Sequence, residues 1–170
     1  MALSAYLILK GQKQGAINGG VTQKGRENTI EVHSFTNEIT SPRDQTTGLP
    51  TGKRVHEPIV ILKALDKSTP LLWQALVSNE NLTQFVLQVY APQIPGGAGV
   101  GGVGAETMIY TISLTNATIS SMRQYMSDNE IATNTSLPVR EEISFTYQKI
   151  TWTWTQGGIT ATDDWSAPVS

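Results

Sequence analysis

The sequence has no cysteine and few charged residues. The lack of cysteine excludes disulfide bonds, thiol catalysis and cysteine-ligated metal sites. Only 15% of the 170 residues are charged, against about a quarter in a typical soluble domain. The 12 basic and 14 acidic residues are scattered, so no Lys/Arg run marks a nucleic-acid site. A surface of low charge repels other copies of the same protein only weakly, which favours self-association.

Long apolar runs are also missing, so we expect no insertion into a membrane. The first ten residues, MALSAYLILK, have no basic start, no extended apolar core and no cleavage site of small residues. We therefore expect no secretory signal peptide. If the protein is exported, a dedicated machine must carry it in the folded state.

Apolar residues recur mainly with a period of two, which predicts a single mainly β domain over residues 1–170. Residues 55–62 are apolar on both faces, so a second layer is expected to cover them. In the last strand the apolar positions change from odd to even numbers near Gln148. This shift indicates a β-bulge, a crossing between two layers, or a second face that meets a partner. The predicted strands are 6–9, 30–35, 55–62, 85–89, 108–114 and 143–155.

One short helix is expected after the third of these strands. Thr69 is the predicted N-cap, and Pro70 occupies the first helical position. Leu71, Leu72, Ala75 and Leu76 then recur at helical spacing, and Ser78 and Asn79 end the helix. This helix is a candidate cover for residues 59–62.

Three segments lack a clear period. The loop 37–54 contains two prolines and two glycines, and structureless loops of this length are usually functional or disordered. Residues 92–104 are almost entirely Gly, Pro and Ala, which predicts the flexible tip of a hairpin. The tail 157–170 is mostly polar.

We find no convincing catalytic, cofactor-binding or metal-binding pattern. The G-x-G-x-x-G at 97–102 precedes a predicted strand, whereas dinucleotide binding requires a following helix. His33 and His56 are isolated from other metal ligands, and no nucleophile elbow is present. The pairs 141–142 and 163–164, both acidic, are expected to be solvated surface carboxylates. We therefore expect a protein that is not an enzyme and needs no cofactor.

Three tryptophans leave an alternative function open. Trp152, Trp154 and Trp165 are able to stack on a ligand, which would suit a carbohydrate- or peptide-binding β-sandwich. Aromatic residues on strands lie more often in a core or a protein interface. A hydrolase or oxidoreductase with an unrecognised site is a further alternative, and a His–carboxylate pair in a pocket would favour it.

Residues 56–71, HEPIVILKALDKSTPL, resemble a hallmark segment of the haemolysin-coregulated protein (Hcp) family, the tube proteins of bacterial type VI secretion systems. The helix start DKSTP at 66–70 is the most specific element. The likeness covers nearly the whole chain, because AYLILKG, IEVHSF, ISLTNATI and FTYQKI resemble other family strands in the correct order.

This resemblance implies a compact β-barrel of two packed antiparallel sheets with one short flanking α-helix. It further implies a homohexameric ring that stacks with other rings into a hollow tube. A contractile sheath would propel this tube with a spike protein into a target cell, and small effector proteins would travel in the lumen. The protein would be made in the bacterial cytoplasm and exported without a signal peptide by the type VI system.

Two sets of residues are candidates for assembly and cargo sites. The loop 37–54 is too long for a simple connector and carries Arg43, Asp44, Lys53 and Arg54, which we expect to mediate ring stacking unless they are merely solvated. The family's second strand is associated with the inner wall of the tube. Ser34 lies on the matching strand, where alternation would otherwise place an apolar residue. We therefore expect it to face the lumen, with a strand end or a tight packing spot as the alternative.

Overall fold

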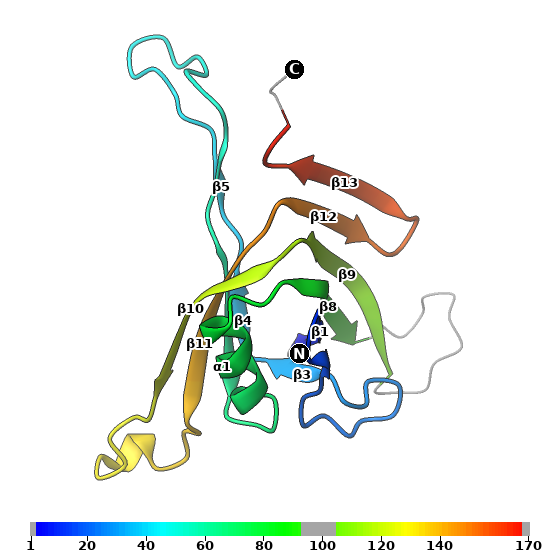
Figure 1. Cartoon of the computed structure of the whole chain (residues 1–170), viewed down its shortest axis with the longest axis vertical. Coiled ribbons are helices and arrows are strands. Elements are labelled where there is room, and N and C mark those ends of the chain that lie inside the picture. The colour runs from blue at the N-terminus through cyan, green and yellow to red at the C-terminus, as the bar shows by residue number, and fades with distance from the viewer. Residues whose placement is uncertain (1–2, 93–104, 168–170) are drawn as a thin grey trace.

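Two packed antiparallel β-sheets, a separate two-stranded sheet and one α-helix make up the described part of the protein (Figure 1). The computed structural model describes residues 3–92 and 105–167, so the G-x-G-x-x-G segment and most of the predicted hairpin tip lie outside the described residues. In chain order the elements are β1 (Ser4–Gly11), β2 (Gly15–Ile17), β3 (Ile30–Val32), β4 (Ser34–Thr36), β5 (Ile39–Thr40), β6 (Val55–His56), β7 (Ile59–Ala64), α1 (Thr69–Val77), β8 (Leu82–Pro92), β9 (Glu106–Thr115), β10 (Thr118–Tyr125), a 3-10 turn (Ala132–Asn134), β11 (Arg140–Thr146), β12 (Lys149–Trp154) and β13 (Ile159–Asp164).

The larger sheet has seven strands in the order β13-β12-β9-β8-β1-β2, with β3 also paired to β1. The smaller sheet has the order β10-β11-β7-β4, and β5 pairs only with β6. The prediction of a mainly β protein with two antiparallel sheets and one short helix is therefore confirmed. The predicted barrel is not, because the hydrogen-bonded strands of the described residues do not close into a ring.

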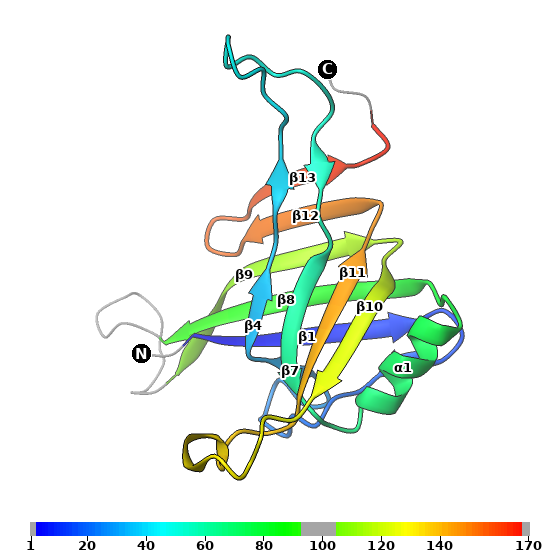
Figure 2. The same cartoon turned by 90° about the vertical axis from the view of Figure 1, so that its left-hand side faces the viewer.

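The hydrophobic core lies between the two sheets, whose strands cross steeply (Figure 2). Alternate residues of the larger sheet, such as Leu7 and Leu87, point into it and are fully buried. Ile61 and Phe145 enter from the smaller sheet, and the Phe145 ring meets that of Phe85 edge to face at 5.0 Å between centroids. Burial of these side chains is the main force that holds the sheets together.

The chain passes from one sheet to the other at three corners. It does so at His33 between β3 and β4, at Asn116 between β9 and β10, and at Tyr147–Gln148 between β11 and β12. Such corners are typical of sheets that pack at a steep angle. The crossing between layers is therefore the explanation of the shift near Gln148, and the predicted strand 143–155 is in fact two strands.

The sequence pattern missed four strands, of which β5 lies in the loop 37–54. Residues of β2 and β10 carry too little apolar alternation to be recognised, and β13 (ITATDD) is exposed over most of its length. A turn with positive φ at Gly157 and Gly158 joins β13 to β12. The tail predicted only as polar thus begins with a hairpin. Pro58, which lacks a backbone donor, follows the end of β6 and separates it from β7.

The helix begins at Thr69, so its N-cap is Ser68 and the predicted cap is shifted by one residue. Leu72 and Ala75 are buried in the core cluster. The helix packs chiefly beside β10 at the edge of the smaller sheet (Figure 2), so it is not the expected cover for residues 59–62. No helix in the described part of the chain is long and apolar enough to cross a membrane.

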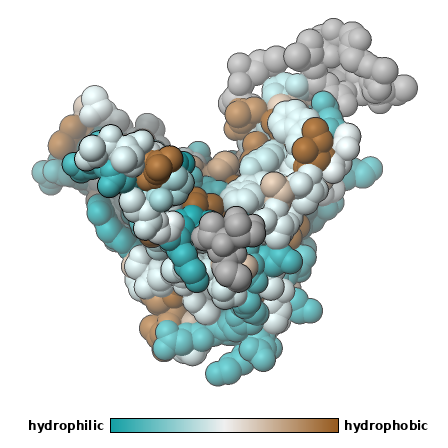
Figure 3. All heavy atoms as spheres, turned by 90° about the horizontal axis from the view of Figure 1, so that it is seen from above, coloured by the Kyte–Doolittle hydropathy of each residue, from teal (hydrophilic) through white to brown (hydrophobic). Residues whose placement is uncertain are grey.

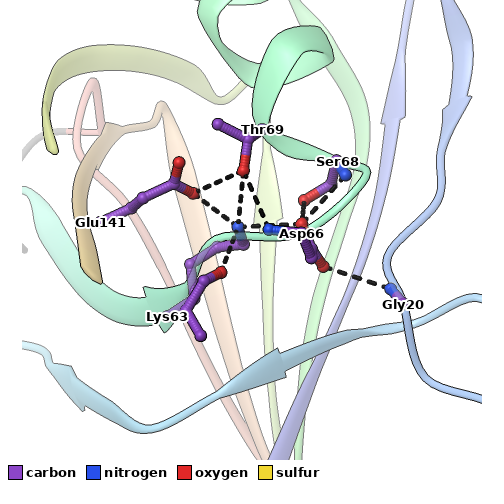
Figure 4. Close-up of polar contacts among 7 residues, drawn as sticks. Gly20, Lys63, Asp66, Ser68, Thr69 and Glu141 are labelled. Carbon is purple, nitrogen blue, oxygen red and sulfur yellow. Dashed lines mark hydrogen bonds and ion pairs between the residues drawn. The ribbon is translucent and has the colours of Figure 1, made fainter. Parts of the chain in front are cut away.

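A buried ion pair joins the helix start to the smaller sheet (Figure 4). Lys63 on β7 and Glu141 on β11 have fully buried side chains, and Lys63 Nζ donates to Glu141 Oε2 at 2.6 Å. The hydroxyl of Thr69 donates to the same oxygen at 2.9 Å and accepts from Lys63 Nζ at 3.3 Å. Glu141 is therefore not the solvated carboxylate expected from the sequence, whereas its neighbour Glu142 faces solvent.

Asp66, the first residue of the segment DKSTP, holds the start of α1 through hydrogen bonds (Figure 4). Its Oδ1 accepts hydrogen bonds from the backbone and hydroxyl of Ser68 at 2.9 and 2.5 Å, and pairs with Lys63 Nζ at 3.0 Å. Its Oδ2 accepts the backbone N–H of Gly20 at 3.2 Å. Burial favours the neutral carboxyl, but the bonds from Ser68 and Lys63 outweigh it and lower the pKa of Asp66.

We predict that Lys63→Met lowers the free energy of unfolding by about 3–5 kcal/mol, because Glu141 would keep a buried charge without its partner. The double variant Lys63→Met/Glu141→Leu should lose much less, since it removes both charges. Lys67→Met, at an exposed position four residues later, should change stability by less than about 0.5 kcal/mol. Denaturant titration measures all three, and equal losses in the single and double variants would contradict the prediction.

Candidate functional site

The predicted stacking loop is a β-hairpin that projects from the body of the protein (Figures 1 and 2). We call residues 37–56 the arm. At its base Ile39 lies opposite His56, and further out Arg43 forms a β-bridge with Pro50. The expectation of a structureless loop is therefore wrong. The arm is exposed on both faces along most of its length, so its strands show no apolar alternation in the sequence.

The turn at the arm's tip is built around Asp44. Its Oδ1 accepts the backbone N–H groups of Thr47 at 2.7 Å and Thr46 at 2.9 Å, and these bonds lower the pKa of Asp44. Gly48 completes the turn with a φ of 70°. Of the four charged candidates, Asp44 thus shapes the arm, while Arg43 and Lys53 are exposed.

The base of the arm is fastened to β13 through Arg54. Its Nε donates to Asp163 Oδ2, and its Nη2 donates to the carbonyl oxygen of Asp164 at 2.7 Å. The hydrogen bond from Arg54, assisted by His56 and opposed by burial, lowers the pKa of Asp163. Arg54 and Asp163 therefore hold the arm in place, and Asp163 is not the free surface carboxylate expected from the sequence.

His56 completes this attachment from the inside. Its Nε2 lies 2.6 Å from Asp163 Oδ2, its Nδ1 lies 2.9 Å from the Tyr147 hydroxyl, and its ring stacks on Trp165 at 5.8 Å between centroids. Burial raises the pKa of Tyr147 to about 12, so its hydroxyl stays protonated near neutral pH. We call Arg54, His56, Tyr147, Asp163 and Trp165 the latch.

The latch contains a His–carboxylate pair, the feature that would favour the enzyme alternative if it lay in a pocket. Both ring nitrogens of His56 already have partners, and the residue is only 4% exposed. The buried ring is not accessible to a substrate, and Asp163 is shared with Arg54, so the geometry suits a structural role. Among the described residues no group of His, Asp and Glu side chains is arranged to hold a metal ion.

Sequence reasoning did not find the latch, although one signal for it was present. Arg54 and His56 are two residues apart, which places both side chains on one face of a strand. Their partner on β13 is more than 100 residues away in the chain. Only the fold shows that this strand passes the base of the arm.

Ser34 is exposed on the outer face of the smaller sheet. It lies opposite Leu62 on β7, while its neighbour Phe35 packs against the core. The serine interrupts the apolar series of Ile30 and Val32 because the corner at His33 moves the chain into the other sheet. Its exposure does not support the alternative of a tight packing spot.

The three tryptophans do not share one exposed aromatic face. Trp152 packs against the core cluster, Trp165 stacks on His56, and Trp154 is 42% exposed near the end of β12. Seen from the arm's end of the molecule, hydrophobic side chains form small separate groups among polar ones (Figure 3). This arrangement gives little support to the sugar-binding alternative.

We predict that Asp163→Asn loosens the arm without unfolding the sheets. Loss of the charge weakens the bonds from Arg54 and His56, so amide hydrogen exchange of residues 37–56 should rise several-fold, while exchange in α1 stays unchanged. Asp128→Asn is the matched control, because the hydrogen bond of Asp128 is made to Glu130, outside the latch. Equal exchange in wild type and Asp163→Asn would contradict a holding role.

The same substitution, Asp163→Asn, should alter how the free energy of unfolding depends on pH under acidic conditions. Because the pKa of Asp163 is lowered in the native state, its contribution is present above the pKa of an unfolded aspartate, about 4, and is lost as pH falls through the native pKa. The free energy of unfolding, measured between pH 5 and pH 2, should therefore fall less steeply in Asp163→Asn than in wild type.

The family model described as "Type VI secretion system effector, Hcp" matches residues 6–154. The "Major exported protein" of Pseudomonas aeruginosa is 37% identical over 100% of this chain and 99% of its own length. The secreted protein Hcp3 of the same species is a similar solved structure, with a TM-score of 0.76 and 32% identity over 98% of this chain and 100% of that one. Another solved Hcp protein reaches a TM-score of 0.86 at 27% identity, with 98% and 100% of the two chains covered.

These matches agree with the segment 56–71 that first pointed to the family, and they extend that likeness over nearly the whole chain. The TM-scores show that the two-sheet fold is shared with solved Hcp proteins. The chain belongs to the Hcp family of type VI secretion systems, a family of secreted tube proteins and not of enzymes.

Proposed function

We propose that this chain forms homohexameric rings that stack into the hollow tube of a type VI secretion system. The observation that carries the proposal is the arm, a hairpin that projects from the body and is held at its base by the latch. A hairpin with exposed edges and tip would be costly to keep as a mere connector, because unpaired strand edges invite association. Contact with a neighbouring ring gives those edges a function.

Ring closure itself requires a heterologous interface that returns on itself after six copies. Both sheets offer free edges for such an interface, at β13 of the larger sheet and at β4 and β10 of the smaller one. The low overall charge, −2 for 170 residues, supports close packing of identical copies. The contractile sheath and the spike protein are the further partners that family membership suggests.

Cargo would bind in the lumen of the ring and not in a pocket of one subunit. The outer face of the smaller sheet, which carries Ser34, is the candidate inner wall. Beside Ser34 lie the half-buried side chains of Leu62 and Val60, and small hydroxyl groups flank them at Thr36 and Ser144. Exposed Glu142 lies opposite Leu62 on the same face. The strip therefore combines apolar, hydroxyl and acidic side chains, a mixed surface that suits contact with small effector proteins.

We predict that deletion of residues 46–50 leaves hexameric rings intact and abolishes tubes. The deletion shortens the exposed tip but spares the latch, so the body should fold as in wild type. Native mass spectrometry reads the ring size, and electron microscopy at high protein concentration detects tubes. A monomer in wild type would refute the ring proposal, and tubes of unchanged length in the deletion variant would refute the stacking role of the arm.

We also predict that Ser34→Gln reduces effector retention while the melting temperature stays unchanged. Six copies of a longer side chain would crowd the bore, but each Gln can remain solvated on a wet wall. If Ser34 instead occupied a tight packing spot, the same change would lower the free energy of unfolding by about 1–3 kcal/mol. Thr160→Gln, at an exposed position of the other sheet, is the control for co-purification of effectors. Undiminished retention would remove Ser34 from the cargo surface.

A further inference from the structure

We infer that the candidate inner wall binds an acidic segment of a small protein through two arginines, Arg123 and Arg140. This inference rests on the proposed placement of the outer face of the smaller sheet along the lumen, and it adds the chemical class of the cargo. Arg123, Tyr125, Arg140 and Glu142 lie together on that face. We call these four residues the charged patch.

The strand register places the four side chains of the charged patch on one face. Arg123 on β10 lies opposite Glu142 on β11, and Tyr125 on β10 lies opposite Arg140 on β11. Successive residues of a strand point to opposite faces of the sheet. Glu141, between Arg140 and Glu142, points to the inner face and is fully buried there, so its two neighbours point outward.

The charged patch occupies the end of the sheet away from the arm. β10 ends at Tyr125 and β11 begins at Arg140, and Figure 2 shows these strand ends at the opposite end of the molecule from the arm. The other paired positions of the same face carry uncharged side chains: Ser34, Thr36, Val60, Leu62, Ala64, Thr118, Ser121, Ser144 and Thr146. The charge of the candidate inner wall is therefore concentrated in one band of each copy.

The charges of this patch are available to a ligand. None of its three charged side chains forms an ion pair with another described residue. The guanidinium of Arg123 lies over the ring of Tyr125, 4.9 Å from its centroid, which holds the side chain against the sheet. The Nε of Arg140 is buried and has no hydrogen-bond partner among the described residues. A buried donor without a partner is costly, so an acceptor supplied by a ligand would be favourable here.

The charged patch is positive although Glu142 lies within it. Two arginines and one glutamate leave one positive charge in each copy, whereas the whole chain has a net charge of −2. Asp128 and Glu130 follow in the loop beyond β10, outside the sheet face. In a hexameric ring, six such patches would face one bore and their potentials would add for a ligand inside it. An acidic ligand would thus be attracted to the wall of the bore and not to the outside of the ring.

The composition of the patch favours an acidic protein segment over a nucleic acid. A nucleic acid carries a phosphate at every nucleotide, so Glu142 would repel it beside the arginines. A protein segment can place carboxylates against Arg123 and Arg140, whose planar guanidinium groups suit bidentate contacts. It can also place an apolar side chain on half-buried Leu62, which lies opposite Glu142 on β7.

Binding of labelled probes to assembled rings tests this inference. The probes are fluorescent octapeptides of glutamate and of lysine and a single-stranded oligonucleotide of eight thymidines, all read by fluorescence anisotropy at low salt. Wild-type rings should bind the glutamate peptide more tightly than the other two probes. Arg123→Gln and Arg140→Gln should each weaken this binding several-fold, whereas Arg123→Lys, which keeps the charge, should weaken it less. Glu142→Gln should strengthen the binding, because it removes the opposing charge.

Lys10→Gln is the matched control, because it removes an exposed positive charge from β1 of the larger sheet and should leave binding unchanged. Unchanged binding in both Arg→Gln variants, weaker binding in Glu142→Gln, or an equal loss in Lys10→Gln would overturn the role of the charged patch. Tighter binding of the oligonucleotide than of the glutamate peptide would overturn the assignment of an acidic protein as cargo. Native mass spectrometry of each protein separates the two proposals. Any of these outcomes with intact rings rejects this inference alone, whereas a monomer in wild type rejects the ring proposal as well.

Discussion

The buried ion pair between Lys63 and Glu141 is the contact on which the position of β7, and of the arm that precedes it, depends. It joins β7, β11 and the start of α1 at one point, where burial removes both charges from bulk solvent. β7 follows the arm directly in the chain, so the position of β7 sets where the arm leaves the body. A buried pair of this kind adds little net stability but penalises any shift that separates the charges. The register of β7 against β11 is therefore tightly defined, and with it the place where the arm leaves the body.

The latch fixes the base of the arm, just before β7 begins. Arg54 and His56 converge on one oxygen of Asp163, so the base of the arm is tied to the larger sheet as well as to the smaller one. A long hairpin without such an attachment would swing freely and would lose conformational entropy on binding. A held arm loses less, so few contacts at its tip would be enough for the proposed stacking of rings. Fastening of the arm gives the buried His–carboxylate pair a structural role.

Period-two alternation predicted the central strands correctly because one of their faces is buried, as Leu7, Leu87 and Ile112 show. The pattern failed where burial does not alternate. The strands of the arm and most of β13 are exposed on both faces, so the selection for alternating apolar residues is absent. It also failed at Glu141, because a charged residue predicts exposure unless its partner is known. Lys63 is 78 residues away along the chain, and no local rule connects the two.

The sequence by itself determined the class of protein: the mainly β composition, the short helix after residue 68, the change of layer near Gln148 and the resemblance to the Hcp family through DKSTP. These features depend on local periods and neighbouring residues, which a sequence displays directly. Only the tertiary structure decided that the loop 37–54 is an ordered arm, that His56 and Asp163 hold it, and that Ser34 faces outward. Each of these results from contacts between segments far apart in the chain. Their formation depends on how two sheets cross, because the packing of the whole core sets which distant strands become neighbours.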